Sequence, residues 1–432
     1  MAALKWLGIA ADESQFQPGT YGPYQQSQRT HLYRRYWEQF LQQGLIYRCF
    51  CSNETLALDR RQHQQISQKP FRYSGRCARL SLTEVKTRLQ QSELFSLRWR
   101  VPPHRCYQFD DLIRGTIKFN SAEIGDWVVM KTDQTPTFNF AVAIDDMLMQ
   151  ITHVIRGEEH ISNTPLQLMI YEALQQEPPQ FAHLNLIVDH TGRKLSKRNF
   201  DQGFFISHYQ QQGYLPIAVF NFLALLGWNP GTNQEIFTVP ELIKQFNPNR
   251  WNKSSSRFEL QRLQHVNRVF LQQLSSAEYL QMVMPFLQNS YPSTFNNYPR
   301  CDLATICLLY REQIAYAAEI STLTRMFFVS TPHVNPITFA TWKQVKLDRH
   351  QMITFRNQVV VQTNWNQKAV QRLISDFKEQ FKLQGAKLYM PLRIMTSLHE
   401  HGPQLTKLIY LLGRERILKN IDYFMKQIKI KH

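Results

Sequence analysis

The sequence predicts an α/β protein in which a parallel-sheet domain comes first and an all-helical region follows. Before the loop TGRKLSKRNF, the chain runs through a helix that starts at Thr164-Pro165 and then a short apolar strand, HLNLIVD. A strand, a helix and a second strand in this order are typical of a parallel sheet, whose ligands bind beyond the carboxyl ends of the strands. From about residue 201 to the end, apolar residues recur at helical spacing. We therefore expect a ligand site at the loop.

Length and charge limit the class of protein. A chain of 432 residues is expected to form two or three domains. The net charge of +17, with Lys and Arg spread along the whole chain, favours a nucleic-acid partner, although a basic proteome would also give a basic protein. No apolar run is long enough to span a membrane, and the start MAALKWLGIAADES is unlike a signal peptide. We expect a soluble, cytoplasmic protein with no membrane partner.

Both helices and strands are predicted ahead of the loop. Apolar residues at steps of four predict an amphipathic helix over residues 28–41. Residues 49–79, with two close cysteines and a polar run, look like a small inserted module. Short β-prone runs between residues 94 and 139 alternate with turn residues and indicate strands. After the loop, LPIAVFNFLALLGWNPG predicts a buried helix that ends at Gly227.

The loop TGRKLSKRNF places Lys194 and Lys197 on either side of Ser196. Flexible ammonium groups can follow phosphate oxygens during a reaction, and a serine hydroxyl adds another donor. This combination suits nucleotidyl transfer, where negative charge builds on a leaving pyrophosphate. The same tetrapeptide in a basic protein is also compatible with a solvated loop.

Several stretches together resemble the class I glutamyl-tRNA synthetases. The KLSKR loop resembles that family's KMSKS signature, and IDDMLMQITHVIRGEEHISNTP resembles the segment that precedes it. Further stretches look like family motifs in the family's order, namely GPYQQSQR, DDLIRGTIKF, TPTFNFAVAIDD, NFLALLGWNP, SSSRFELQRLQHVN and KLYMPLRIMTSLHEHGPQLTKLIYLLG. The resemblance covers essentially the whole chain.

The resemblance implies a class I synthetase fold. A Rossmann-like catalytic domain, incomplete at its N-terminus, would carry an inserted acceptor-binding domain and be followed by an all-α anticodon-binding domain. The implied domains are residues 1–40 (remnant of the first catalytic half), 41–135 (acceptor-stem-binding insertion), 136–200 (second catalytic half), 201–272 (stem-contact helical domain) and 273–432 (anticodon-binding domain).

The resemblance also implies glutamate–tRNA ligase activity. ATP and L-glutamate would give glutamyl-adenylate, and the glutamyl group would then pass to the 3′ end of tRNA(Glu). Lys194, Ser196 and Lys197 match the family's catalytic loop, and Glu159 and His160 would join them at the ATP. ATP with Mg²⁺, glutamate and tRNA(Glu) are thus the implied partners, and we expect a monomer.

The implied glutamate site contains Arg156, Phe138 and His160. Arg156 matches the arginine that holds the side-chain carboxylate of the amino acid, a task suited to a planar guanidinium that donates two parallel hydrogen bonds. Some family members have tyrosine where Phe138 stands, so this chain lacks that hydroxyl. Basic residues of the helical half, including Arg257 and Arg393, would neutralise tRNA phosphates.

The cysteine module resembles the family's zinc-binding insertion. Cys49, Cys51, Tyr73 and Cys77 supply three thiolates and a phenol, which is enough for a four-coordinate structural site. Phenolate is a rare zinc ligand, and other members place a histidine just after the third cysteine. A zinc site and three reduced cysteines in a small knuckle therefore both stay open.

One family motif has no counterpart near the start of the sequence. The other half of the family's ATP site is a HIGH-type motif, and no Pro-x-Pro-x-Gly or His-x-Gly-His pattern occurs there. The resemblance therefore implies that about 50 residues, a strand with its crossover helix, are absent. Three readings follow: a ligase whose sequence starts late, a tRNA-binding paralogue that is catalytically inactive or regulatory, or a ligase that charges a different glutamate- or glutamine-type tRNA.

Overall fold

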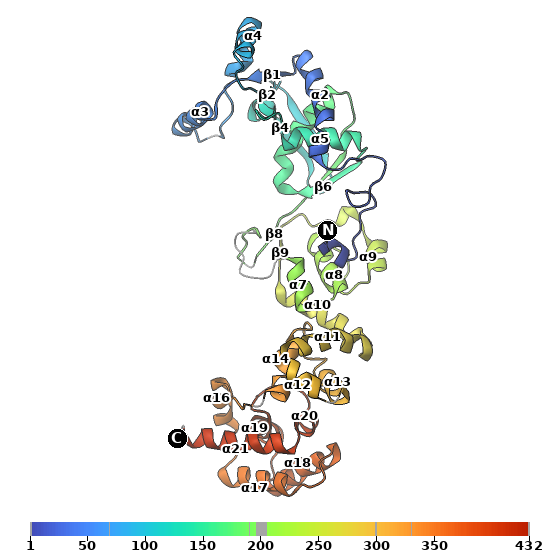
Figure 1. Cartoon of the computed structure of the whole chain (residues 1–432), viewed down its shortest axis with the longest axis vertical. Helices are drawn as coiled ribbons and strands as arrows, with labels where there is room; N and C mark the ends of the chain where they lie inside the picture. The colour runs from blue at the N-terminus through green and yellow to red at the C-terminus, as the bar shows by residue number, and fades with distance from the viewer. Residues whose placement is uncertain are drawn as a thin grey trace.

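The computed structural model describes residues 2–68, 70–189, 191–195, 205–298, 300–329 and 331–430. Figure 1 shows an elongated molecule with its main sheets at one end and the C-terminal helices at the other. Ser196 and Lys197 lie outside the described residues. No helix in the described part of the chain is both long enough and apolar enough to cross a membrane.

The first half of the chain contains an antiparallel three-stranded sheet. Its strands are β1 (Ile46–Cys49), β2 (Ser96–Trp99) and β5 (Trp127–Met130), in the order β1-β2-β5. The helices α2 (Thr30–Gln42) and α5 (Phe138–Leu148) pack against it. Phe40 of α2 meets the edges of Trp99 and Phe140, with ring centroids 5.1 and 6.2 Å away. The helix predicted over residues 28–41 is confirmed as α2.

A mixed sheet carries the candidate site. Its strands are β4 (Gly115–Asn120), β3 (Cys106–Asp111), β7 (Gln180–Leu184) and β6 (His153–Gly157), in the order β4-β3-β7-β6. The strands β3, β7 and β6 run parallel to one another, and β4 is antiparallel to β3. α6 (Thr164–Ala173) connects β6 to β7, with Pro165 at its start as predicted. The parallel α/β unit expected from the sequence is confirmed.

The strand predicted as HLNLIVD is wrong in extent. β7 begins earlier, at Gln180, and ends at Leu184, whereas β8 (Ile187–Val188) belongs to another sheet. β8 pairs in parallel with β9 (Ser256–Arg257). The strand breaks at Asn185. The side-chain amide of Asn185 donates to the Asn252 carbonyl and accepts from Arg114, so this residue does not continue the strand's alternation of apolar and polar side chains. The polar side chain thus redirects the strand toward the helical half.

The inserted segment between β1 and β2 is helical. α3 (Asn53–Ile66) starts at Ser52, whose hydroxyl accepts from the Thr55 amide, and α4 (Leu82–Gln90) starts at a Ser81 capping box. Both helices project from the body of the molecule (Figure 1). Two 3-10 turns occur nearby, at Arg76–Arg79 and Ser121–Glu123.

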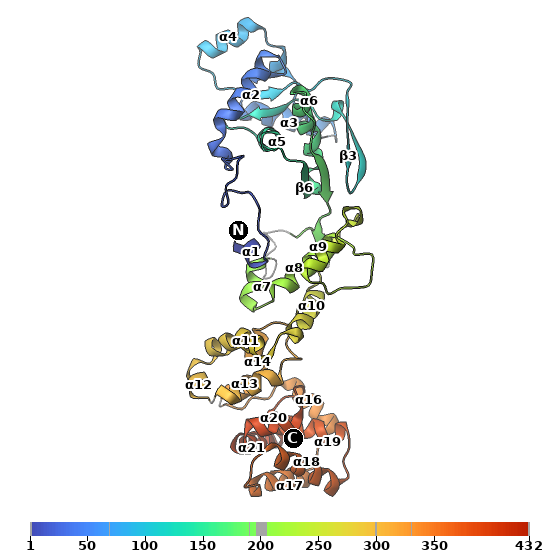
Figure 2. The ribbon, with the colours of Figure 1, turned by 90° about the vertical axis from the view of Figure 1, so that its right-hand side faces the viewer.

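The N-terminal segment reaches the helical half. α1 (Ala2–Trp6) lies beside α7 (Ile206–Gln212), and Leu7 packs with Tyr209 and Tyr214. The N-terminus therefore lies in the middle of the molecule, next to α8 (Figure 2). Farther on, a 3-10 turn at Gln26–Gln28 precedes α2.

The second half is helical, as predicted. α8 (Pro216–Gly227), α9 (Val239–Gln245) and α10 (Leu260–Gln273) form the middle of the molecule. The remaining helices are α11 (Ser276–Ser290), α12 (Pro292–Asn297), α13 (Arg300–Leu309), α14 (Glu319–Leu323), α15 (Arg325–Phe328), α16 (Pro336–Val345), α17 (Arg349–Val361), α18 (Gln367–Phe381), α19 (Ala386–Ser397), α20 (Leu405–Leu412) and α21 (Arg414–Ile430). A 3-10 turn, Pro248–Arg250, follows α9.

Candidate active site

Arg156 lies near the carboxyl end of β6 and is held by three hydrogen bonds. Its Nε donates to Nε2 of His183 at 3.1 Å, and its Nη2 donates to Oγ1 of Thr164 at 2.8 Å and to the His160 carbonyl at 3.4 Å. Its guanidinium carbon also lies 5.4 Å from the centre of the Phe181 ring. Burial lowers the pKa of Arg156, but a guanidinium keeps its charge at neutral pH. The side chain is therefore a fixed, partly desolvated cation.

His183 is the support of Arg156. It is fully buried at the adjacent strand end, and its Nδ1 lies 2.6 Å from Oδ2 of the equally buried Asp111. A carboxylate only accepts, so Nδ1 carries the proton and the Nε2 lone pair receives the Arg156 Nε–H. Burial lowers the pKa of His183, which keeps the ring neutral at pH 7. Asp111, His183 and Arg156 thus form one hydrogen-bonded chain.

Asp111 is itself fixed by the backbone around it. Oδ1 accepts from the amides of Ile113 and Arg114, at 3.0 and 2.9 Å, and Oδ2 also accepts from the His183 amide at 3.0 Å. These bonds satisfy a carboxylate that has no contact with water. The carboxylate therefore sets the orientation of the imidazole rigidly.

Two adjacent aspartates on α5 differ in their environment. Asp145 is engaged by buried groups: Arg29 Nε lies 2.6 Å from Oδ1, and the Tyr33 hydroxyl lies 2.8 Å from Oδ2. Asp146 has no such partner among the described residues, and burial raises its pKa to about 6, although the nearby Arg156 opposes the shift. Asp145 is structural, whereas Asp146 is a carboxyl group beside Arg156 that titrates in the weakly acidic range.

The predicted residues Phe138 and His160 lie together near Arg156. Their ring centroids are 5.5 Å apart, and half of the Phe138 surface is exposed. Nδ1 of His160 lies 3.0 Å from the amide nitrogen of Asn163, which fixes the ring. Two of the three predicted glutamate-binding residues thus form an open ring pair, and the third, Arg156, bonds to the backbone of His160.

The described part of the lysine loop approaches the same place. Lys194 Nζ lies 3.1 Å from a carboxylate oxygen of Glu159 in a half-exposed ion pair. A backbone hydrogen bond, together with the Lys194 ammonium, lowers the pKa of Glu159. The turn before Lys194 is closed by the Asp189 carboxylate, which accepts from the Thr191 amide, and Gly192 adopts a φ of +83°. Gly192 is needed for the turn, since L-residues rarely adopt that φ.

Glu158 has a different role from its neighbour. Its carboxylate pairs with Arg114 and accepts from the Leu186 amide at 3.3 Å. Arg114 also contacts Asn185, at the break between β7 and β8. Glu158 therefore holds the strand ends together, and it is Glu159 that contacts the loop.

The residues Asp111, His183 and Asp146 are absent from the set predicted from the sequence. Each had a local signal: His183 opens HLNLIVD, beyond whose carboxyl end we expected a ligand, and Asp111 and Asp146 lie within the quoted motifs DDLIRGTIKF and IDDMLMQ. Asp111 and His183 are 72 positions apart in the sequence, and only the order of the strands in the sheet brings them together.

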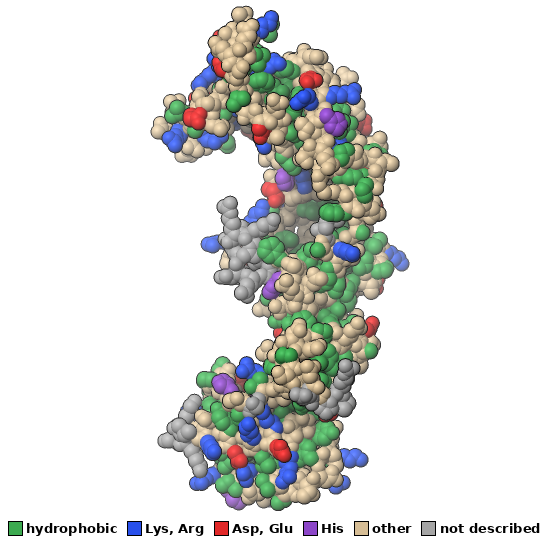
Figure 3. Space-filling view, viewed as in Figure 1, with side chains coloured by type: hydrophobic (Ala, Val, Ile, Leu, Met, Phe, Trp, Pro, Cys, Tyr) green, Lys and Arg blue, Asp and Glu red, His purple; other side chains and the backbone are tan. Residues whose placement is uncertain are grey.

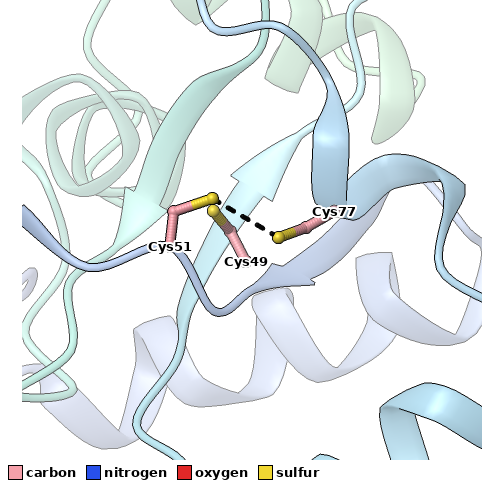
Figure 4. Close-up of side chains that lie close together, drawn as sticks. All are labelled: Cys49, Cys51 and Cys77. Atoms are coloured by element: carbon pink, nitrogen blue, oxygen red, sulfur yellow. Dashed lines mark hydrogen bonds between the residues drawn. The ribbon is translucent and has the colours of Figure 1, made fainter. Parts of the chain in front are cut away.

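The cysteine module forms a compact cluster (Figure 4). The sulfurs of Cys49, Cys51 and Cys77 all lie within 4.8 Å of one another, and those of Cys51 and Cys77 are 3.6 Å apart. The Tyr73 hydroxyl lies 3.4 and 3.3 Å from the sulfurs of Cys49 and Cys51. A hydrogen bond from the Cys77 thiol lowers the pKa of Cys49, which favours a thiolate there. The guanidinium of Arg98 stacks on the Tyr73 ring at 4.1 Å.

This donor set fits a structural zinc ion. Zn–S bonds of about 2.3 Å in a tetrahedral site bring sulfurs to within 4 Å of each other, close to the observed spacing. The predicted ligands are therefore brought together, including the phenol. No carboxylate or histidine joins the three cysteines in the part of the chain that the structure describes.

Two family models match the chain. Residues 1–265 match the catalytic domain of class I tRNA synthetases (E and Q), and residues 278–425 match an anticodon binding domain. The fold and the site thus define a class I aminoacyl-tRNA synthetase. This agrees with the predicted fold class, an α/β catalytic part followed by a helical one.

Relatives specify the family further. The glutamate–tRNA ligase of Mycoplasma capricolum is 39% identical over 97% of this chain and 87% of its own length. The enzyme of Geobacillus stearothermophilus is 38% identical over 98% of this chain and 87% of its own. A crystal structure of a glutamate tRNA ligase from Elizabethkingia meningosepticum in complex with its amino acid has a TM-score of 0.83 at 30% identity, covering 98% of this chain and 88% of that one. The chain belongs to the glutamyl-tRNA synthetase family.

The predicted family is therefore confirmed. The expected absence of an N-terminal segment stays a prediction, because the alignments cover 97–98% of this chain and 87% of each relative's own length.

Proposed function

We propose that the protein is a glutamate–tRNA ligase, which activates glutamate with ATP and transfers it to the 3′ end of tRNA(Glu). Membership of the family supports the activity. The choice of glutamate as the amino acid rests on Arg156, which is a partly buried cation. Its Nε donates to the neutral ring of His183, and the Asp111 carboxylate holds that ring in place. A site for a carboxylate side chain needs such a preorganised guanidinium.

Arg156 binds the side-chain carboxylate of glutamate in this proposal. Its Nε and Nη2 are occupied by protein acceptors, and no hydrogen bond between described residues uses Nη1. The two N–H groups of Nη1 are left for the substrate, because Nη2 donates to both Thr164 and the His160 carbonyl. Neutral His183 accepts a hydrogen bond from Arg156 without adding positive charge. The guanidinium therefore keeps its orientation, and its one positive charge faces the one negative charge of the substrate's side-chain carboxylate.

Lys194, Ser196 and Lys197 act on ATP. In the first step an oxygen of the α-carboxylate of glutamate attacks the α-phosphorus of ATP. The bond between this phosphorus and the pyrophosphate breaks, and pyrophosphate leaves. The ammonium groups of Lys194 and Lys197 stabilise the charge that develops on the leaving pyrophosphate, with Mg²⁺ bound to the phosphates. The ion pair of Lys194 with Glu159 holds the loop beside the site before ATP arrives. His160 completes the pocket.

In the second step the terminal ribose hydroxyl of tRNA attacks the glutamyl carbonyl, and AMP leaves. We assign residues 136–200, with 1–40, to the catalytic domain, 41–135 to the acceptor end, and 201–272 and 273–432 to the stem and anticodon. The charge of +17 supports tRNA binding. Basic side chains are visible on the C-terminal helices (Figure 3). A zinc ion at Cys49, Cys51, Tyr73 and Cys77 would have a structural role, and the protein would work as a cytoplasmic monomer.

Charging of total tRNA with radioactive glutamate tests the proposal. We expect Arg156→Ala to lower kcat/KM for glutamate by about 100-fold or more, because two charge-assisted bonds are lost. The dissociation constant for tRNA should not change. Arg61→Ala, an exposed arginine of α3, is the matched control and should retain its glutamate KM.

Three results would count against the proposal. If Arg156→Ala charged glutamate normally, the assignment of the amino acid site would be wrong. If glutamine but not glutamate were attached by the wild type, the specificity would be wrong. If the wild type bound tRNA but attached neither, the protein would be the non-catalytic tRNA-binding paralogue that is the alternative from the sequence.

A further inference from the structure

Arg98, on β2, is a buried arginine without a carboxylate partner. Its side chain is 7% exposed. Its Nη1 donates to the Asp126 carbonyl at 3.2 Å, whereas its buried Nε has no hydrogen-bond partner among the described residues. In the described part of the chain, Arg98 forms no ion pair. A buried cation is costly unless an anion lies close to it.

The carboxylate of Asp126 is engaged by other groups. Its Oδ2 accepts from the Tyr47 hydroxyl at 2.6 Å, and its Oδ1 accepts from the Val101 amide at 2.9 Å. Arg98 bonds to the backbone carbonyl of Asp126 and not to this carboxylate. The negative charge that balances Arg98 is therefore expected from another group.

The cysteine module lies on the same face of the sheet as Arg98. In the antiparallel pairing of β1 with β2, Arg98 lies opposite Tyr47. Cys49 lies two positions after Tyr47 on β1, opposite Ser96. Side chains two positions apart on a strand point to the same face, so Cys49 shares a face with Arg98. The guanidinium carbon of Arg98 lies 4.1 Å from the centre of the Tyr73 ring, so Arg98 contacts the module at Tyr73.

The hydroxyl oxygen of Tyr73 lies among the three cysteines. It is 3.4 and 3.3 Å from the sulfurs of Cys49 and Cys51, and it accepts from the Cys77 amide at 3.0 Å. A tetrahedral zinc ion, about 2.0 Å from an oxygen ligand and about 2.3 Å from sulfur, would hold the two ligand atoms about 3.5 Å apart. The oxygen is therefore placed as a fourth ligand of zinc would be.

The charge of this ligand set requires a cation beside it. Three thiolates and a phenolate carry four negative charges, and a zinc ion neutralises only two of them. Excess negative charge inside a protein is costly unless it is compensated. A guanidinium keeps its charge when buried, and it is attracted to the face of an aromatic ring. Arg98 meets both requirements over the ring of Tyr73.

We propose that Arg98 is a positioning residue of the zinc site, which stabilises Tyr73 as the phenolate ligand that completes the coordination of the ion. The zinc-bound anion in turn balances the buried guanidinium. Ala78 and Arg79, which follow the third cysteine, supply no imidazole that could take the place of the phenolate. The inference rests on the zinc ion proposed above and does not depend on ligase activity.

Replacements of Arg98 separate its charge from its packing. Arg98→Gln removes the charge and keeps an N–H donor for the Asp126 carbonyl, and Arg98→Met removes the charge with an apolar side chain suited to burial. Arg98→Lys keeps the charge. The matched control is Arg100→Gln, because Arg100 is exposed and its guanidinium carbon lies 4.9 Å from the ring centre of Tyr47, which is not a predicted ligand. Circular dichroism establishes that each variant is folded.

The first readout is the dissociation constant for zinc, measured by withdrawing the ion from the loaded full-length chain with a chromophoric chelator. We expect the neutral variants of Arg98 to bind zinc about 10- to 100-fold more weakly, the usual effect of removing a group that supports a metal ligand. Arg98→Lys and Arg100→Gln should stay within about threefold of the wild type. In a double-mutant cycle, Arg98→Gln should cost little affinity once Tyr73→Phe has removed the ligand oxygen.

The second readout follows the phenolate itself. Withdrawal of zinc from the wild type should remove the ultraviolet absorption of a phenolate, and Tyr73→Phe should show no such change. Zinc release without this change would overturn the inference. Additive effects of Arg98→Gln and Tyr73→Phe would also overturn it, as would equal losses of affinity in Arg98→Gln and Arg100→Gln. A wild-type chain that takes up no zinc would overturn it as well.

Glutamate charging distinguishes this inference from the proposed function. If the wild type charges tRNA but the neutral variants of Arg98 bind zinc as tightly as the wild type, this inference alone fails. If Arg98 and Tyr73 are coupled in zinc binding but no glutamate is attached to tRNA, the proposed function alone fails.

Discussion

The sharpest perturbation of the proposed glutamate site is Asp111→Asn. The substitution keeps the size of the side chain but removes the charge that accepts the Nδ1–H of His183 at 2.6 Å. An amide that presents its NH₂ to the ring would shift the proton to Nε2, where it would face the Nε–H of Arg156 across 3.1 Å. Two donors would then oppose each other, and Arg156 would lose its orientation.

The magnitude follows from the burial of the pair. Both side chains are 0% exposed, so solvent does not screen the interaction. A hydrogen bond to a charged group contributes about 1.5–3 kcal/mol, and 1.4 kcal/mol is tenfold in an equilibrium constant. We therefore expect kcat/KM for glutamate to fall by about 10- to 100-fold.

Charging kinetics with tRNA present at every step are the assay. The glutamate KM should rise most, while the KM for ATP and the dissociation constant for tRNA stay within about twofold of the wild type, a change worth under 0.5 kcal/mol. A purely structural effect would change all three together. Glutamate kinetics unaltered in a folded Asp111→Asn protein would refute the reasoning.

Four predictions remain. Because burial raises the pKa of Asp146 to about 6 from 3.8, its contribution to the free energy of unfolding should fall as pH rises from 4 to 6, and urea titrations of Asp146→Asn should lack this fall. Asp145→Ala should lose about 3–5 kcal/mol of stability, since it strands a buried arginine; a loss below 1 kcal/mol in the same titrations would contradict this. Elemental analysis should find one zinc ion per chain in the wild type. The Cys77→Ser variant should lose this ion, and the control Cys106→Ser, at an exposed cysteine, should keep it. A wild-type protein without zinc would favour three reduced cysteines. Affinity for tRNA should fall steeply between 50 and 200 mM salt, and a flat response would exclude phosphate neutralisation.

The regular elements were predictable from local patterns. Pro165 marks the start of α6, and Gly227 the end of α8, because each acts on the backbone next to it. The extent of HLNLIVD was not predictable, since its break depends on Asn185 bonding to Asn252, 67 residues away. Alternation of apolar residues cannot report a contact of that kind.

The candidate site was predictable only in part. Arg156, His160, Phe138, Glu159 and Lys194 were found through the resemblance, and the structure places them close together. Which of them act in catalysis stays a prediction, as do the roles of the loop residues outside the described part.

The support of Arg156 escaped prediction for a physical reason. A histidine at a strand end is usually a core residue whose hydrogen bonds are satisfied. The residues next to His183 in the sequence do not indicate that its partner is an aspartate on another strand. Asp111 and His183 become neighbours only because β3 lies next to β7 in the sheet order β3-β7-β6.

The elongated shape has a thermodynamic consequence. The apolar cores are separate: one unites α2 and α5 with the first sheet, another lies among α11 to α14, and a third among α16 to α21. Heat should therefore melt the protein in successive stages, and the calorimetric enthalpy should exceed the van't Hoff value. Glutamate bound at Arg156 would raise only the transition of the first core, and tRNA, which would span several cores, would merge the transitions. The pattern of melting thus reports where each substrate binds.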